Sequence, residues 1–176
     1  MALDRSTVAE WFPETDLLVV PDQVLPSGLT DADARTLLSE VGLPERVLDV
    51  VEMHVLIVER IVTIEDELAS HGGHAPPGAA DLYYLGFVGD PMLAIDGTTG
   101  ALVEVDLGFG TRPLAGSLET FLRVLGPLNR LIDEYQDQAE FDPDRFTEEL
   151  RRQALPELER LETTVSEAQI ESWDQL

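Results

Sequence analysis

Alternation of apolar and polar positions is clearest in residues 93–106, LAIDGTTGALVEVD, where two alternating runs flank a Gly-Thr-Thr-Gly turn. Leu93 and Ile95 lie two residues apart before the turn, and Val103 and Val105 lie two apart after it, so each run presents one apolar face. This pattern predicts a β-hairpin. A phosphate-binding loop would place its glycines between a strand and a helix, whereas a second strand follows here, so we interpret the turn as structural.

Two strands precede the second arm of this hairpin. The runs LYYLGFV and PMLAID, separated by Gly89-Asp90, combine with ALVEVD to predict a three-stranded antiparallel meander, and LGFGTRPLAG leads out of it as a loop. Tyr83 and Tyr84 begin the first strand, and one of them must face away from the core because neighbours on a strand alternate sides. We take Tyr83 as a candidate partner contact, and packing under a neighbouring helix is the alternative.

Helix signals mark two segments of the N-terminal half. Thr7 and Glu10 have capping-box spacing, which predicts the start of a short helix, and DLLVV then predicts a brief strand. Residues 29–45, LTDADARTLLSEVGLPE, predict a helix with Thr30 as its N-cap. The glycine and proline that follow should end that helix.

Two more helices are predicted in the C-terminal half. Ser117 is the expected N-cap of LETFLRVLGPLNRLIDEYQ, in which apolar residues recur at helical spacing. Gly126-Pro127 should kink or split that helix. Asp142 and Pro143 occupy the N-cap and first helical positions of a further helix.

Residues 46–68, RVLDVVEMHVLIVERIVTIEDEL, fit two patterns. Their many β-branched side chains favour strands, which is the interpretation we adopt. A helical stripe can also be drawn through Val47, Val51, His54, Val58 and Ile61. The next segment, ASHGGHAPPGAAD, predicts a flexible loop because its Gly-Gly and Pro-Pro pairs suit neither element.

Composition limits the class of protein. The 176 residues fit a single domain, and the absence of cysteine excludes disulfides, thiolate metal sites and a cysteine nucleophile. The N-terminus lacks a basic segment followed by a long apolar one, and the aliphatic run VLIV is too short to span a bilayer. We therefore expect a cytoplasmic protein without a membrane partner.

Charge is the strongest global feature. Eleven arginines, no lysine and 35 acidic residues give a formal net charge of −24. Direct nucleic-acid binding is not expected, because it depends on Lys and Arg patches that release phosphate counterions. The acidity suits either a basic protein partner or general solvation.

Candidate catalytic and metal-binding residues are few. His71 and His74 lie three apart and could converge on a metal ion, with Asp81 or Glu67 enlisted as a further ligand. Two exposed loop histidines are the alternative that we favour. Ser117 lacks the G-x-S-x-G pattern of a nucleophile elbow, and helix capping explains it. We expect no cofactor, no bound metal and no enzymatic activity.

Acidic residues are densest from residue 133 onward. This stretch is either a solvated face or a docking surface for a basic partner. Its candidate partner-binding residues are Asp133, Glu134, Asp137, Glu140, Asp142 and Asp144.

Three segments in the same order resemble one protein family. They are LTDADARTLLSEVGLPE, YYLGFVGDPMLAIDGTTGALVEVD and AGSLETFLRVL, and the closing IESWDQL is also similar. Together they resemble the SUKH superfamily of bacterial immunity proteins, in particular its fourth subfamily, which is common in actinomycetes. Ala115 and Gly116 depart from the family pattern, which often has an asparagine before the serine that opens the long helix.

The resemblance implies an α+β fold: an antiparallel-rich sheet with a β-meander and helices packed mainly on one side. It also implies a single immunity domain that binds the toxin of a polymorphic toxin system and occludes its active site. Many such toxins act on nucleic acids and are basic, which suits an acidic inhibitor. A regulatory scaffold with a host protein partner is the alternative function, and the oligomeric state stays open.

Overall fold

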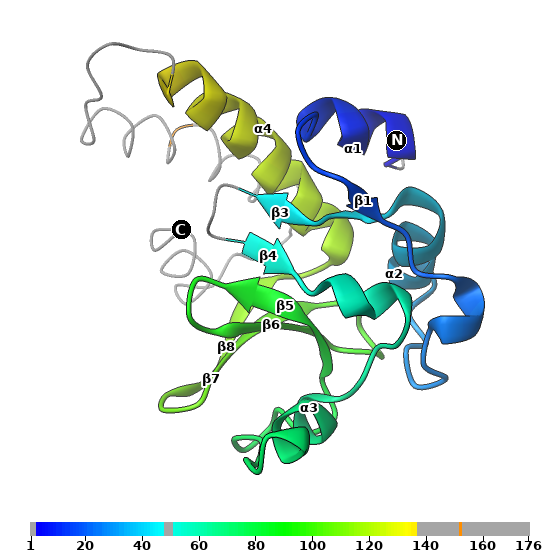
Figure 1. Cartoon of the computed structure of the whole chain (residues 1–176), viewed down its shortest axis with the longest axis vertical. Helices are drawn as coiled ribbons and strands as arrows, with labels where there is room; N and C mark the ends of the chain where they lie inside the picture. Colours follow the sequence, from blue (N-terminus) through cyan, green and yellow to red (C-terminus); the bar gives the residue numbers. More distant parts are fainter. Residues whose placement is uncertain (1–2, 48–50, 137–151, 153–176) are drawn as a thin grey trace.

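The core of the fold is a six-stranded antiparallel sheet, seen in a computed structural model that describes residues 3–47, 51–136 and Arg152 (Figure 1). The strands lie side by side in their order along the chain, so the sheet is one continuous meander. They are β3 (Arg46–Val47), β4 (Val51–Met53), β5 (Tyr83–Val88), β6 (Met92–Ile95), β7 (Leu102–Asp106) and β8 (Gly110–Ala115). The expected α+β fold with an antiparallel meander is confirmed.

Helices and a second, two-stranded sheet accompany the six-stranded sheet. Six elements precede β3 in the chain: α1 (Arg5–Trp11), β1 (Leu17–Leu18), η1 (Asp22–Val24), α2 (Ala32–Thr36), η2 (Leu37–Val41) and β2 (Leu43–Pro44). Strands β1 and β2 pair with each other. Between β4 and β5 lie η3 (Val55–Val58) and α3 (Ile64–Ser70), and after β8 comes α4 (Leu118–Gln136). None of the helices in the described ranges is long and apolar enough to cross a membrane.

Apolar side chains cover the sheet on both faces. All four residues of β6 are buried. Leu93 and Ile95 belong to the larger apolar cluster, to which α1, α2 and α4 contribute and which contains Phe121. Met92 belongs to a second cluster on the opposite face, with Ile64 of α3. Helices thus pack mainly on one side, as expected, and α3 packs on the other (Figure 1).

The expected exit loop LGFGTRPLAG is largely a strand. Residues Gly110–Ala115 form β8, which pairs with β7 along its length, and only residues 107–109 make a turn. The prediction was wrong because it followed the Gly and Pro content of the segment, and these residues are commoner in loops than in strands. Pro113 is tolerated because β8 is an edge strand, whose outward side needs no hydrogen-bond donor.

Residues 46–68 form strands only in their first part. Val51 and Met53 are buried on one side of β4, as the strand interpretation predicts. From Val55 onward the prediction was wrong: η3 follows, and then α3, whose N-cap Thr63 accepts a hydrogen bond from the Asp66 amide at 3.1 Å. Helix α3 also includes the first two residues of the predicted loop ASHGGHAPPGAAD. The N-cap and the acidic first turn stabilise a helix here, and they outweigh the preference of the β-branched residues for a strand.

Two helices begin at a different cap from the predicted one. Asp31, not Thr30, caps α2, and its carboxylate accepts a hydrogen bond from the Ala34 amide at 2.8 Å. Asp4 caps α1 in the same way by accepting from the Thr7 amide at 2.8 Å, so Thr7 lies inside the helix. The predicted helices exist, but an aspartate takes each N-cap position.

The Gly-Thr-Thr-Gly turn joins the sheet to α2. The predicted hairpin is confirmed as β6 and β7. The Gly97 carbonyl accepts hydrogen bonds from the Thr30 and Asp31 amides at 2.6 and 3.1 Å, at the start of α2. A side chain at Gly97 would collide with the Gly28 carbonyl and the Tyr83 ring, so this close approach requires glycine. The turn is therefore a packing contact between elements.

Helix α4 begins as predicted and is not split. Ser117 Oγ accepts a hydrogen bond from the Thr120 amide at 3.1 Å, which confirms the N-cap. The helix continues through Pro127 to Gln136. The helix predicted to begin at Asp142 lies outside the described residues.

Helix α1 crosses α4 at a glycine. A Cβ atom at Gly126 would lie 2.5 Å from the Trp11 ring. The Asn129 side chain donates a hydrogen bond to the Trp11 carbonyl at 3.0 Å, which fixes the same contact one turn further along. The two helices therefore meet at a distance that only glycine permits.

Gly126→Ala should destabilise the protein. Alanine is ordinarily better than glycine within a helix by about 0.5–1 kcal/mol, but here its methyl group would overpack the Trp11 ring at a cost of about 1–3 kcal/mol. The measurement is the free energy of unfolding in urea.

Two controls test whether crowding against the Trp11 ring is the cause of the loss. At Gly73 a Cβ atom would lie 3.5 Å from the nearest non-neighbouring atom, an ordinary contact, so Gly73→Ala should change stability little. In a Trp11→Ala background, Gly126→Ala should cost little or should stabilise. An unchanged cost in that background would show that the ring contact is not the reason.

Asp96→Asn should reduce the loss of stability in acid. The Thr99 and Thr98 amides donate to the Asp96 carboxylate and hold the pKa of that group below its usual range. A lowered folded-state pKa gives stability that is present above the unfolded pKa of about 3.9 and is lost as pH falls through the folded value. Urea midpoints at pH 6 and pH 2.5 should therefore differ less in Asp96→Asn than in wild type. Equal differences would contradict this role.

Candidate partner-binding surface

The two candidate metal-binding histidines each face a different carboxylate. His71 Nε2 lies 3.6 Å from Glu67, and His74 Nδ1 lies 3.3 Å from Glu65. The Glu65 carboxylate also accepts a hydrogen bond from the Ala75 amide at 2.7 Å, and this bond, followed by the one with His74, lowers the pKa of Glu65. These contacts fasten the loop after α3 to that helix. Within the described ranges, no three histidine or acidic side chains are grouped to hold a metal ion.

Tyr83 and Tyr84 point to opposite faces of the sheet, and both pack against neighbours. Tyr84 is 3% exposed and belongs to the cluster beneath α3, and burial raises the pKa of its hydroxyl, so it stays protonated at neutral pH. Tyr83 packs on the other face, close to Gly28 and Gly97, and stays partly exposed. Neither tyrosine simply faces solvent, because both faces of the sheet are covered. A partner contact by Tyr83 stays a prediction.

The predicted acidic surface falls mostly outside the described part of the chain. Asp133 and Glu134 lie near the C-terminal end of α4. Asp137, Glu140, Asp142 and Asp144 lie outside the described residues. Partner binding by this cluster stays a prediction.

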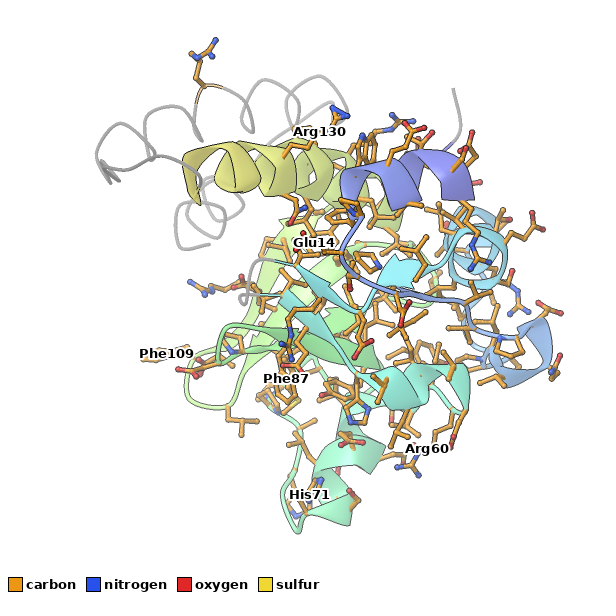
Figure 2. All side chains as sticks on the ribbon, turned by 45° about the horizontal axis from the view of Figure 1, so that its top comes forward. Glu14, Arg60, His71, Phe87, Phe109 and Arg130 are labelled. Atoms are coloured by element: carbon orange, nitrogen blue, oxygen red, sulfur yellow. The ribbon has the colours of Figure 1, made fainter. Side chains whose placement is uncertain are left out.

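Exposed apolar side chains gather at one end of the sheet. Phe109 is 91% exposed, Leu107 63% and Phe87 39%. In a meander, the β5–β6 and β7–β8 turns lie at the same end, opposite the β6–β7 turn that contacts α2. Figure 2 shows Phe87 and Phe109 on the same side of the molecule, with Phe109 projecting outward.

We call this end of the sheet the turn-end surface and define it as Phe87, Asp90, Asp106, Leu107 and Phe109. All five are exposed or half-buried. Burying an aromatic side chain of this size is worth about 1.5–3 kcal/mol, and Phe109 gains almost none of it within the fold. Sequence reasoning missed this surface, although LGFG, with Phe109 between two glycines and Leu107 just before them, was a visible signal.

The turn that carries Phe109 is held in one conformation. The Asp106 carboxylate accepts hydrogen bonds from the Gly108 and Phe109 amides at 2.7 and 2.9 Å. Gly110 has a φ of +88°, which residues with a side chain rarely adopt, and it returns the chain into β8. Phe109 is therefore presented from an ordered turn.

An ion pair between a buried carboxylate and a partly exposed arginine joins the two strands below this turn. Glu104 of β7 lies directly opposite Arg112 of β8, and their charged groups are 2.7 Å apart. Glu104 is only 3% exposed. A shift in register would separate the buried Glu104 carboxylate from the Arg112 guanidinium, so the pair favours a single register of the hairpin.

Comparison with protein families gives a match over nearly the whole chain. The family model described as SUKH-4 immunity protein matches residues 3–174, nearly the whole chain. No curated protein and no solved structure matches. The matched span includes the meander, both helical layers and the turn-end surface. The chain therefore belongs to the SUKH-4 immunity protein family.

Proposed function

We propose that this protein is a non-catalytic immunity protein that acts in the cytoplasm and neutralises one cognate toxin of a bacterial polymorphic toxin system. The observation that carries the proposal is the family match over residues 3–174. Neutralisation occurs by binding the toxin domain and occluding its active site. The protein uses no cofactor in this role, because steric occlusion requires only a complementary surface.

The chemistry of the partner follows from charge. A net charge of −24 repels nucleic acid and attracts a basic protein. Toxin domains that act on nucleic acids carry basic surfaces to bind phosphates, so an acidic inhibitor would reach them by electrostatic steering and would cover the face they need. We therefore propose a basic, nucleic-acid-targeting toxin domain as the partner.

The proposed contact surface includes the acidic cluster that begins near the end of α4. Asp133 and Glu134 open this cluster, and Asp137, Glu140, Asp142 and Asp144 continue it. Tyr83 would contribute the exposed part of its ring. Carboxylates at an interface chiefly raise the association rate and select against partners of the wrong charge.

Co-expression tests the function itself. We propose that a gene adjacent to this one encodes the toxin domain. That domain is induced in a bacterial host with or without the immunity protein. The proposal predicts that growth stops with the toxin domain alone and is restored when both are present. Continued growth arrest with both proteins present in soluble form would contradict the proposal.

Reversing two charges of the cluster should slow association. Asp133→Lys/Glu134→Lys should lower the association rate constant for the toxin domain several-fold at low salt and make its salt dependence shallower, because steering is local to the contact face. The measurement is surface plasmon resonance over a series of NaCl concentrations.

The matched control is Glu40→Lys/Glu59→Lys. Both residues are exposed, and the double change alters total charge by the same amount on other parts of the surface. The control should retain most of the wild-type association rate. Equal effects from the two double variants would show that only total charge matters, and the acidic cluster would then not be the contact surface.

A further inference from the structure

We propose that the turn-end surface is a second contact with the toxin, in which Phe109 inserts into an apolar recess on the toxin's basic face. This inference rests on the proposed function and adds to it an anchoring side chain outside the acidic cluster. The partner it fits is a basic protein domain with an apolar pocket.

The distribution of exposed apolar residues supports this assignment. Among the described residues, five large apolar side chains are exposed, and three of them lie at this end of the sheet. The other two, Val55 and Leu56, lie together on η3. The Phe87 ring packs edge-on against the buried Tyr84 ring, with ring centres 5.6 Å apart, and this contact orders the Phe87 side chain. Exposed apolar side chains on an ordered support are typical of a binding hot spot.

The order of the turn supports an anchoring role for Phe109. The two hydrogen bonds accepted by Asp106 fix the backbone at Phe109, and the Glu104–Arg112 pair fixes the register of the strands below. A residue whose backbone is already ordered loses less conformational freedom on association than one in a mobile loop. Phe109 is therefore suited to insertion into a partner.

Charge selects the chemistry of the occupant. The β5–β6 turn carries Asp90, Asp106 ends β7 just before the β7–β8 turn, and neither turn contains an arginine. Carboxylates beside an exposed aromatic ring disfavour an acidic partner, a second copy of this chain included, and favour a basic one. In Figure 1 the C-terminal end of α4 lies at the upper left of the molecule and these turns lie lower on the left.

The test compares toxin binding by wild type, Phe109→Ala and the matched control Val55→Ala/Leu56→Ala. The probe is the purified toxin domain encoded by the adjacent gene, and the readout is the dissociation constant with its two rate constants. Phe109→Ala should raise the dissociation constant about 30-fold or more, mainly through faster dissociation. The control removes exposed apolar groups elsewhere and should stay within about 2-fold of wild type.

Each remaining outcome counts against the inference. As a folding control, the melting temperature of Phe109→Ala should equal that of wild type, because Phe109 is 91% exposed. Tight wild-type binding with equal affinity for Phe109→Ala would overturn the anchor and leave the proposed function intact. Absence of wild-type binding would overturn both. Size-exclusion evidence that Phe109 instead mediates self-association would assign the surface to a second copy of this chain.

Discussion

Burial of strand β6 on both faces is the constraint on which the rest of the structure depends. With Leu93 and Ile95 on one side and Met92 and Ala94 on the other, the strand leaves no face for water, so the sheet needs two separate covers. Helices α1, α2 and α4 supply the larger cover, and α3 supplies the smaller one. The insertion between β4 and β5 that carries α3 is therefore part of the core.

The two ends of this sheet differ in how much of their surface is covered by the rest of the protein. At one end the Gly97 carbonyl accepts hydrogen bonds from amides at the start of α2, so the β6–β7 turn packs against the rest of the protein. At the other end Phe87, Leu107 and Phe109 stay exposed. The immunity family to which the chain belongs acts against toxins, and we propose this exposed end as a contact for the toxin.

The features that could be predicted from sequence are those that depend on residues close together in the chain. The hairpin around the Gly-Thr-Thr-Gly turn and the Ser117 cap were predictable because each depends on a few adjacent residues. Strand β8 was missed because the cost of Pro113 depends on its being at an edge, which only the assembled sheet decides. The turn-end surface was missed for the same reason, since exposure of Phe109 depends on what packs nearby. The acidic cluster was chosen on charge alone, and most of it lies outside the described residues.

Stoichiometric titration of the toxin domain's activity tests the central claim, neutralisation by occlusion, most directly. The toxin domain encoded by the adjacent gene is held at a fixed concentration well above the dissociation constant while this protein is added. Occlusion predicts that activity falls linearly and reaches zero at one equivalent. Activity that persists at excess, or that is abolished by a small fraction of an equivalent as catalytic modification would produce, would contradict the account.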